Sequence, residues 1–243
     1  MVQRDQEPMP FFQLLPNLVT IAGMCLGLTA IRFVMAGRFE IAVTLILLAA
    51  LLDGVDGLIA RRLRATSEFG AELDSLSDFL NFGVVPGLLV YRFALGEANS
   101  LGWVFVLIYA AAGCLRLARF NVMRAETQGT SRHFTGVPAP AGAMLALLPV
   151  FVTLAGFASA PEAPGLVALW LGLVGALMIS RIPTFSPKGL RIPRGRIGLM
   201  LIGTAIAMGL IFTRFWVLMV LVDLAYIVAL IPAIWRSRRN LLR

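Results

Sequence analysis

Residues 53–78 read DGVDGLIARRLRATSEFGAELDSLSD, and six of the thirteen acidic residues of the chain fall inside this stretch. Apolar sequence long enough to cross a bilayer precedes and follows it, so the acids lie where two hydrophobic segments meet. Ionised side chains at membrane depth are costly unless they are paired, solvated or bound to a cation. The stretch therefore predicts a functional site at the turn between two membrane-spanning helices.

The composition of the whole chain is that of an integral membrane protein. Hydrophobic residues make up 59% of the 243 residues and charged residues 14%, a balance that soluble domains of this length do not show. Counting roughly 20 apolar residues per crossing predicts an all-α polytopic fold with about eight transmembrane helices. We expect these near residues 17–35, 40–61, 73–95, 101–122, 136–157, 164–182, 197–214 and 216–235.

The spans leave no room for a soluble domain, so we expect a single transmembrane catalytic domain over residues 17–235. Residues 1–16 are expected to form a cytoplasmic arm whose apolar side chains suit a short interfacial helix. Residues 236–243 are expected to form a basic cytoplasmic tail. The only two cysteines, Cys25 and Cys114, lie in apolar stretches without a paired motif, which indicates packing and no disulfide.

Basic residues indicate how the chain lies in the membrane, because Lys and Arg of short loops are retained on the cytoplasmic side. Clusters of them follow the second, fourth and sixth spans and close the chain. Both termini and the acidic stretch are therefore expected on the cytoplasmic face of the cell (inner) membrane. This topology and the attraction to anionic lipid account for the net charge of +8, so no nucleic-acid partner is expected.

The spacing of the four aspartates in the stretch predicts a metal site. Asp53 and Asp56 are three residues apart, and Asp74 and Asp78 are four apart, so each pair shares one helix face. The short link between them predicts an antiparallel hairpin that brings the four together. Any one of these residues could simply end a helix near water, but four carboxylates at one place favour a hard cation such as Mg²⁺, Mn²⁺ or Ca²⁺. A pair of such ions would suit phosphoryl chemistry.

Read as one pattern, D-x2-D-G-x2-A-R-x8-G-x3-D-x3-D, the stretch resembles the signature of the CDP-alcohol phosphatidyltransferases at every fixed position. The resemblance implies a bundle of six core helices, usually in a homodimer, to which two more helices are added here. It implies transfer of a phosphatidyl group from CDP-diacylglycerol to an alcohol, with CMP leaving. It also implies dependence on Mg²⁺ or Mn²⁺, with two ions in the site.

The resemblance implies a role for individual residues as well. Asp53, Asp56 and Asp74 would bind metal, and Asp78 would bind metal and act as the catalytic base. A Pro-Asn-x-x-Thr start of the first span is similar to the family and adds two residues to the donor site. The residues implied for CDP-diacylglycerol binding are Asn17, Thr20, Asp53, Gly57, Ala60, Arg61 and Gly70. Arg61 could also be one more residue that fixes the topology.

Further segments at 74–86, 115–121, 134–140, 180–183 and 191–193 look like bacterial membrane-embedded phosphatidylserine synthases, which implies L-serine as the acceptor. Serine is a zwitterion, so its site needs a cation for the carboxylate, and arginine offers a planar fork for that purpose. Arg116 and Arg119 share a helix face at the expected depth, and Asn121 could assist them. The two arginines could equally hold a donor phosphate or serve only the topology.

Other acceptors and one other class of protein remain open. Choline would call for an aromatic cage, which the motif region lacks, whereas glycerol 3-phosphate or inositol phosphate would need further cations such as those of residues 188–196. A divalent-cation transporter would also gather acids in a helical bundle, but its site is expected at the membrane midplane. Asp223, an acid within the last span, has no assigned role.

Overall fold

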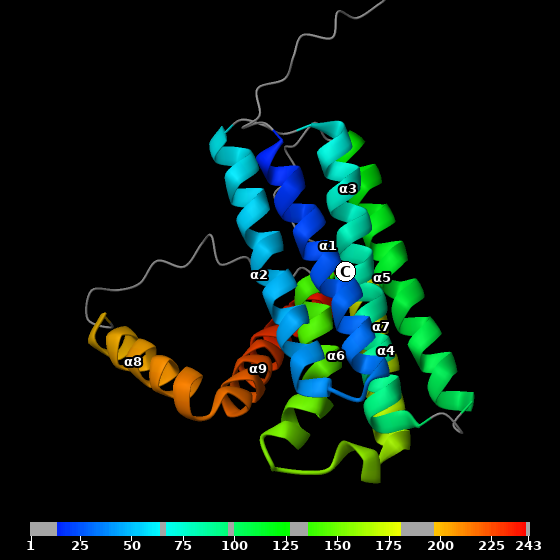
Figure 1. Ribbon diagram of the computed structural model, residues 1–243, viewed down its shortest axis with the longest axis vertical. Coiled ribbons are helices and arrows are strands. Elements are labelled where there is room, and N and C mark those ends of the chain that lie inside the picture. The colour runs from blue at the N-terminus through cyan, green and yellow to red at the C-terminus, as the bar shows by residue number, and fades with distance from the viewer. Residues whose placement is uncertain (1–13, 64–66, 97–99, 127–135, 181–196, 242–243) are drawn as a thin grey trace, which may run out of the picture.

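The computed structural model describes residues 14–63, 67–96, 100–126, 136–180 and 197–241, and these ranges are helical with no strand. The helices follow one another as antiparallel neighbours in most of the bundle (Figure 1). In chain order they are α1 (Leu15–Met35), α2 (Phe39–Leu63), α3 (Glu68–Asp78) continuing through α4 (Val85–Val90) to Leu95, α5 (Ser100–Glu126), α6 (Ala139–Leu154), α7 (Pro164–Ile179), α8 (Ile197–Thr213) and α9 (Phe215–Leu241).

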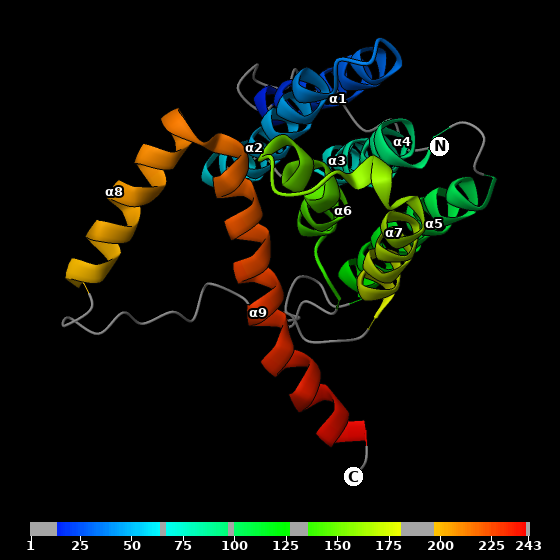
Figure 2. The ribbon, with the colours of Figure 1, turned by 90° about the horizontal axis from the view of Figure 1, so that it is seen from below.

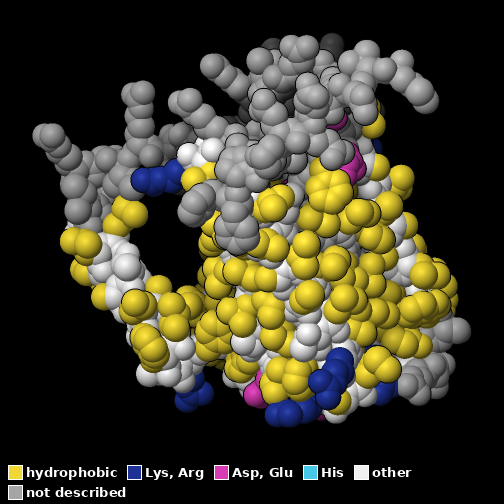
Figure 3. All heavy atoms as spheres, turned by 45° about the horizontal axis from the view of Figure 1, so that its top comes forward, with side chains coloured by type: hydrophobic (Ala, Val, Ile, Leu, Met, Phe, Trp, Pro, Cys, Tyr) yellow, Lys and Arg dark blue, Asp and Glu magenta, His cyan; other side chains and the backbone are white. Residues whose placement is uncertain are grey.

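The prediction of an all-α polytopic membrane protein with about eight helices is confirmed over the residues that the structure describes. Five helical segments are long and apolar enough to cross a membrane, and α6, α7 and α8 are shorter apolar helices. Hydrophobic side chains cover most of the face seen in Figure 3, as expected of a surface in contact with lipid. Residues 1–13 of the arm that we expected over residues 1–16, and residues 181–196, lie outside the described residues, and α1 begins at Leu15.

Three helix ends differ from the prediction for identifiable reasons. The third helix begins at Glu68, because the Ser67 hydroxyl accepts a hydrogen bond from the Gly70 amide at 3.0 Å and caps it. Helix α6 begins only at Ala139, after Gly136 takes a positive φ of 85°. Helix α9 continues to Leu241 through most of the expected tail, where basic residues favour the carboxyl end of a helix.

Helix α1 is the central element of the half that carries the motif. It packs against both α2 and α3, and Figure 1 shows it between them. Its buried face is a stripe of mostly small residues, which lets the neighbouring backbones approach closely. These buried residues are Pro16, Thr20, Gly23, Gly27, Ala30 and Val34. The helices α2 and α3 are therefore antiparallel, as expected of a hairpin, but α1 lies between them.

The third helix is irregular directly after the motif. Two π-helical turns, η2 (Phe79–Val84) and η3 (Tyr91–Leu95), flank α4, and Pro86 lies in its first turn. Proline has no N–H to donate to the carbonyl four residues earlier, which is that of Phe82. The buried Tyr109 hydroxyl of α5 donates to this carbonyl at 2.6 Å instead. This bond ties α5 to the third helix near the acidic residues.

The other half of the molecule consists of α6, α7 and the final pair. Helix α7 packs along α5, whereas α6 contacts α7, α9 and the third helix. Gly175 allows the close approach of α7 and α5, since a Cβ there would lie 3.3 Å from the Tyr109 Cα. Helix α8 stands away from the bundle and is joined to it through α9 (Figures 1 and 2).

Candidate metal and substrate site

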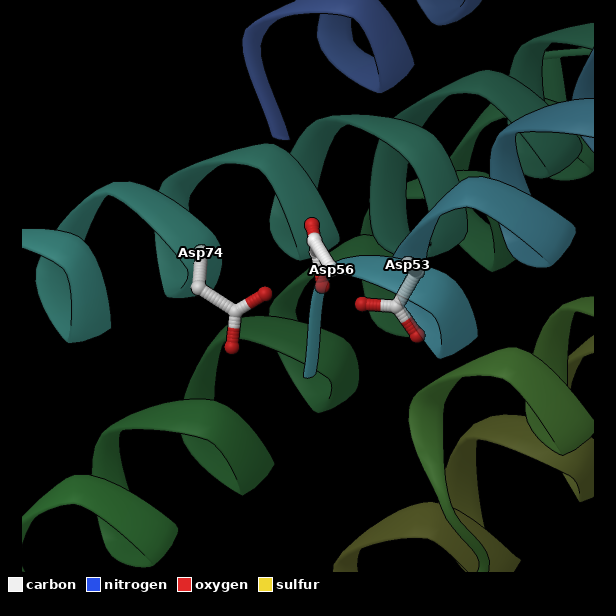
Figure 4. Close-up of side chains that lie close together, drawn as sticks. All are labelled: Asp53, Asp56 and Asp74. Atoms are coloured by element: carbon white, nitrogen blue, oxygen red, sulfur yellow. The ribbon is translucent and has the colours of Figure 1, made fainter. Parts of the chain in front are cut away.

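Three of the four predicted metal ligands meet at the motif end of the bundle. Carboxylate oxygens of Asp53, Asp56 and Asp74 all lie within 4.8 Å of one another, and the side chains converge from α2 and α3 (Figure 4). Asp56 is buried, at 5% exposed, and the other two are half-buried. The helix spacing puts the first two on one face of α2, as the sequence predicted.

Helix α1 fixes the position of the buried carboxylate. The Thr20 hydroxyl donates to Asp56 Oδ2 at 2.7 Å and lies 3.1 Å from the carbonyl of Pro16. On the other side of α1, the Ser77 hydroxyl of α3 lies 3.4 Å from the Thr20 carbonyl. Thr20 of α1 thus contacts both helices that carry the aspartates. These contacts connect α2 and α3 through α1, which lies between them.

Asp78 lies one turn beyond Asp74 on α3 and outside the cluster of three. Its carboxylate interacts electrostatically with those of Asp53 and Asp74 and with the Arg116 guanidinium of α5. The fourth predicted carboxylate therefore borders the cluster and faces a cation.

The residues expected to bind the donor line one cavity of about 290 Å³ beside the carboxylates. Both acidic helices and α1 contribute to its wall. Asn17, Thr20, Gly57, Ala60, Arg61 and Gly70 all lie in the wall, together with Asp56 and Asp74. Among the residues predicted for donor binding, only Asp53 is absent from the lining and belongs to the carboxylate cluster alone.

Two glycines of the motif keep this cavity open. A Cβ on Gly70 would lie 2.7 Å from Asn17 Oδ1 and 3.0 Å from the Ser67 hydroxyl, so a side chain there would displace wall atoms. A Cβ on Gly57 would meet only Arg61 Nη2, at 4.0 Å, and would project into the open space that the guanidinium borders. The glycines therefore allow close approach of a bulky ligand to the backbone.

The three residues predicted for serine or phosphate take different positions. Arg116 lies beside Asp78, as described above, and its Nε atom is buried without a hydrogen-bond partner among the described residues. Arg119 donates from Nη1 to the Ile179 carbonyl at 2.9 Å, at the carboxyl end of α7. Asn121 is paired with the Ser75 hydroxyl, at 3.0 Å from Nδ2. Arg119 and Asn121 thus form hydrogen bonds to other helices that the sequence did not predict.

Sequence reasoning missed four residues of the cavity wall, namely Pro16, Ser67, Ala71 and Phe120. The capping pattern of a serine before an acidic residue could have identified Ser67. Phe120 follows Arg119 at the end of α5 and is 42% exposed. No pattern in the sequence indicates that its ring closes one side of the cavity.

The donor set of the cluster fits a hard divalent cation. Three carboxylates whose oxygens lie this close repel one another in a medium of low polarity, and a bound cation would remove the repulsion. All three ligands are oxygen atoms, which suit Mg²⁺ or Mn²⁺ better than zinc. The adjoining cavity leaves room for a phosphate-bearing ligand to complete the coordination.

Comparisons with known proteins agree with this geometry. The sequence profile of the CDP-alcohol phosphatidyltransferase family matches residues 13–179, which include α1 to α7. A Mycobacterium tuberculosis protein named CDP-diacylglycerol–serine O-phosphatidyltransferase is 37% identical over 93% of this chain and 80% of its own length.

Two further relatives carry the same name. The Mycobacterium leprae protein is 41% identical over 70% of this chain, and the match spans only 58% of that relative. The Methanocaldococcus jannaschii protein is 35% identical over 68% of this chain and 71% of its own length. The similarity thus extends from bacteria to an archaeon.

Proposed function

Because this chain belongs to the CDP-alcohol phosphatidyltransferase family, we propose that it transfers the phosphatidyl group of CDP-diacylglycerol to the hydroxyl of L-serine. The products would be phosphatidylserine and CMP, so the function is phospholipid biosynthesis. The single observation that carries the proposal is the meeting of three carboxylates, two of which line a cavity together with the other motif residues. The names of the three relatives support serine as the acceptor.

The donor is proposed to bind with its CMP moiety in the 290 Å³ cavity. Gly57 and Gly70 would border the nucleotide, and Arg61 would meet a phosphate at the rim of the cavity. Asp53, Asp56 and Asp74 are the residues that would hold a divalent cation. A bound cation would supply charge neutralisation on the pyrophosphate and so ease the departure of CMP.

Asp78 is proposed to act as the general base. Its carboxylate would take the proton of the serine hydroxyl, whose oxygen forms a bond to the phosphorus that carries the diacylglycerol. The bond from that phosphorus to the bridging oxygen breaks, and CMP leaves with the electron pair. Arg116 interacts electrostatically with Asp78, which supports the proposal that its guanidinium binds the serine carboxylate. No covalent enzyme intermediate is needed.

The site is proposed to face the cytoplasm of a cell with this protein in its inner membrane. The clustering of basic residues after alternate spans supports that orientation. A single catalytic domain over residues 17–235 and a homodimeric assembly are proposed along with it. Serine would then reach the site from the cytoplasm, and CDP-diacylglycerol would reach it from the membrane in which it is embedded.

The test is CMP release by the purified protein in detergent with CDP-diacylglycerol and Mg²⁺ or Mn²⁺. Serine, glycerol 3-phosphate, inositol phosphate and choline are offered in parallel, beside an Asp78→Asn variant. We expect release that needs serine, the metal and Asp78. Turnover with another acceptor alone would refute serine, and no turnover with any acceptor in folded, metal-loaded protein would refute the transferase.

A further inference from the structure

A line of buried polar side chains leads from the carboxylate cluster into the bundle. Thr20 Oγ1 donates to Asp56 Oδ2 at 2.7 Å, and the Thr20 carbonyl accepts from the Ser77 hydroxyl at 3.4 Å. The Ser77 oxygen in turn accepts from Asn81 Nδ2 at 3.3 Å. None of these four residues is more than 6% exposed. A proposed metal ligand on α2 is thus connected, through α1, to a residue of η2 that lies outside the cavity wall.

The Asn81 amide lies in a notch of α1 formed by Gly23 and Gly27, which are both buried and share one face of that helix. Asn81 Oδ1 occupies the place that a Cβ on Gly27 would need, and a Cβ on Gly23 would lie 3.8 Å from Asn81 Nδ2. Oδ1 has no hydrogen-bond partner among the described residues. Its contact with α1 therefore consists of close packing, to which a glycine Cα–H group can add a weak attraction.

Packing in this notch determines how α1 lies relative to the third helix, because α1 contacts both α3 and η2. Protein interiors are densely packed, and helices in membranes associate closely where small residues let their backbones approach. If α1 slid or rotated, other atoms of α1 would move into the space that the Asn81 amide fills. The amide therefore restrains both the rotation of α1 and its position along its axis.

The position of α1 matters to the metal site because Thr20 lies on the same face as the two glycines, three and seven residues before them. The bond from its hydroxyl to Asp56 is 2.7 Å long, and such bonds need an oxygen–oxygen distance of about 2.5–3.0 Å. A shift of α1 by about 1 Å would take the hydroxyl out of this range. The buried carboxylate would then lose a donor that holds it in place.

We propose that Asn81 is a positioning residue of the metal site, which holds Thr20 of α1 against the Asp56 carboxylate through Ser77 and the glycine notch. This inference rests on the proposed function, because Asp56 is one of the ligands proposed there for the divalent cation. Asn81 itself touches neither the cavity nor the cluster of three carboxylates. Its effect on the cation is therefore indirect and must pass through Thr20.

The test is Mn²⁺ binding by the purified full chain, followed by electron paramagnetic resonance. Asn81→Ala removes the amide and keeps every motif residue, and the Kd for Mn²⁺ should rise about threefold to tenfold, because a bond to a charged group is weakened. The double variant Thr20→Val/Asn81→Ala should bind Mn²⁺ within about twofold of Thr20→Val alone, because Asn81 acts through Thr20. A role in bundle stability alone would lower the melting temperature of Asn81→Ala and leave the Kd unchanged.

The matched control is Trp170→Phe, which removes another hydrogen bond between helices, from the Trp170 Nε1 of α7 to the Leu145 carbonyl of α6 at 2.7 Å. This variant should keep the Kd for Mn²⁺. If Asn81→Ala does not fold, Ser77→Ala takes its place, since it removes only the oxygen that links Asn81 to Thr20. We expect Ser77→Ala to raise the Kd about threefold.

An unchanged Kd in folded Asn81→Ala, or in Ser77→Ala where it takes its place, overturns the inference. A double variant whose Kd rises by the product of the two single factors overturns it as well, because Asn81 would then act independently of Thr20. An equal rise in Trp170→Phe, or a wild type without saturable Mn²⁺ binding, has the same consequence. Binding is measured without turnover, so a chain that binds Mn²⁺ as expected but does not use serine refutes the proposed acceptor and leaves the inference standing.

Discussion

Two cavities in the bundle differ in both size and chemistry. The cavity beside α2 and α3 measures about 290 Å³ and is lined by two aspartates, an arginine, an asparagine and hydroxyl groups. The cavity between α6 and α7 is larger, at about 510 Å³, and its wall is almost wholly aliphatic and aromatic. The larger cavity therefore has few polar groups that could bind or activate a substrate. The smaller cavity has several that converge, which is typical of a functional site.

The membrane explains why the larger cavity is apolar. Leu166 and Leu169, which line it, are 73% and 64% exposed, so it opens on a surface of the kind that contacts lipid chains. The polar cavity instead lies next to charged groups, which are costly at that depth without a function. The comparison predicts that substitutions at the first cavity change catalysis and that those at the second do not.

The largest effect is expected from Asp74→Asn, which removes one charge from the carboxylate cluster and leaves the shape unchanged. Serine-dependent CMP release should fall by about 10³-fold or more, because both the cation and the phosphate it neutralises would be held poorly. Glu72→Gln, an exposed acid on the same helix, is the control and should keep its activity. Similar losses in both variants would mean that general charge, and not this cluster, matters.

A smaller effect is expected from Gly70→Ala, because the added Cβ would lie 2.7 Å from Asn17 Oδ1. The displaced asparagine would narrow the cavity, and the KM for CDP-diacylglycerol should rise on the order of tenfold, the cost of one disturbed polar contact. Gly54→Ala on α2 is the matched control, since a Cβ there meets nothing within 4 Å. An unaffected Gly70→Ala enzyme would argue against donor binding in this cavity.

Thr20→Val tests the hydrogen bond from α1 to Asp56 at 2.7 Å. Loss of a bond to a buried charged group is expected to raise the Mn²⁺ concentration for half-maximal activity by about threefold to tenfold. Thr20→Ser should restore the wild-type value because it keeps the hydroxyl. Thr29→Val on the same helix removes only a bond to a backbone carbonyl on the exposed side and serves as the control.

The smallest effect is expected at the apolar cavity. Leu148→Phe adds volume to its wall without a polar atom, and CMP release should stay within about twofold of the wild type while the melting temperature shifts. A loss of activity above about tenfold, with the protein still folded, would break the distinction between the two cavities. It would mean that this end of the bundle takes part in the reaction.

Much of the fold follows from the sequence, since apolar segments of spanning length give both the class and the order of the helices. The aspartate pairs share helix faces as their spacing required. The sequence did not predict that α1 lies between α2 and α3, because this position depends on how the small residues of α1 pack against both helices. Nor did it predict the π-helical turns on either side of α4, or the hydrogen bond from the Tyr109 hydroxyl to the Phe82 carbonyl, which joins residues of two different helices.

Individual roles of the polar residues on α5 were the hardest to predict. Arg119 and Asn121 lie near the helix end, as expected, yet they bond to Ile179 and Ser75. The sequence gives the face and depth of a residue, whereas its partner comes from another helix whose rotation is set by packing.

The most direct test of the account is a titration with Mn²⁺ followed by electron paramagnetic resonance, which reports the ion bound to the purified chain. We expect saturable binding in the wild type and its loss when Asp53, Asp56 and Asp74 are all changed to Asn in protein that remains folded. Equal Mn²⁺ binding by the two proteins would contradict the assignment of the cluster as the metal site.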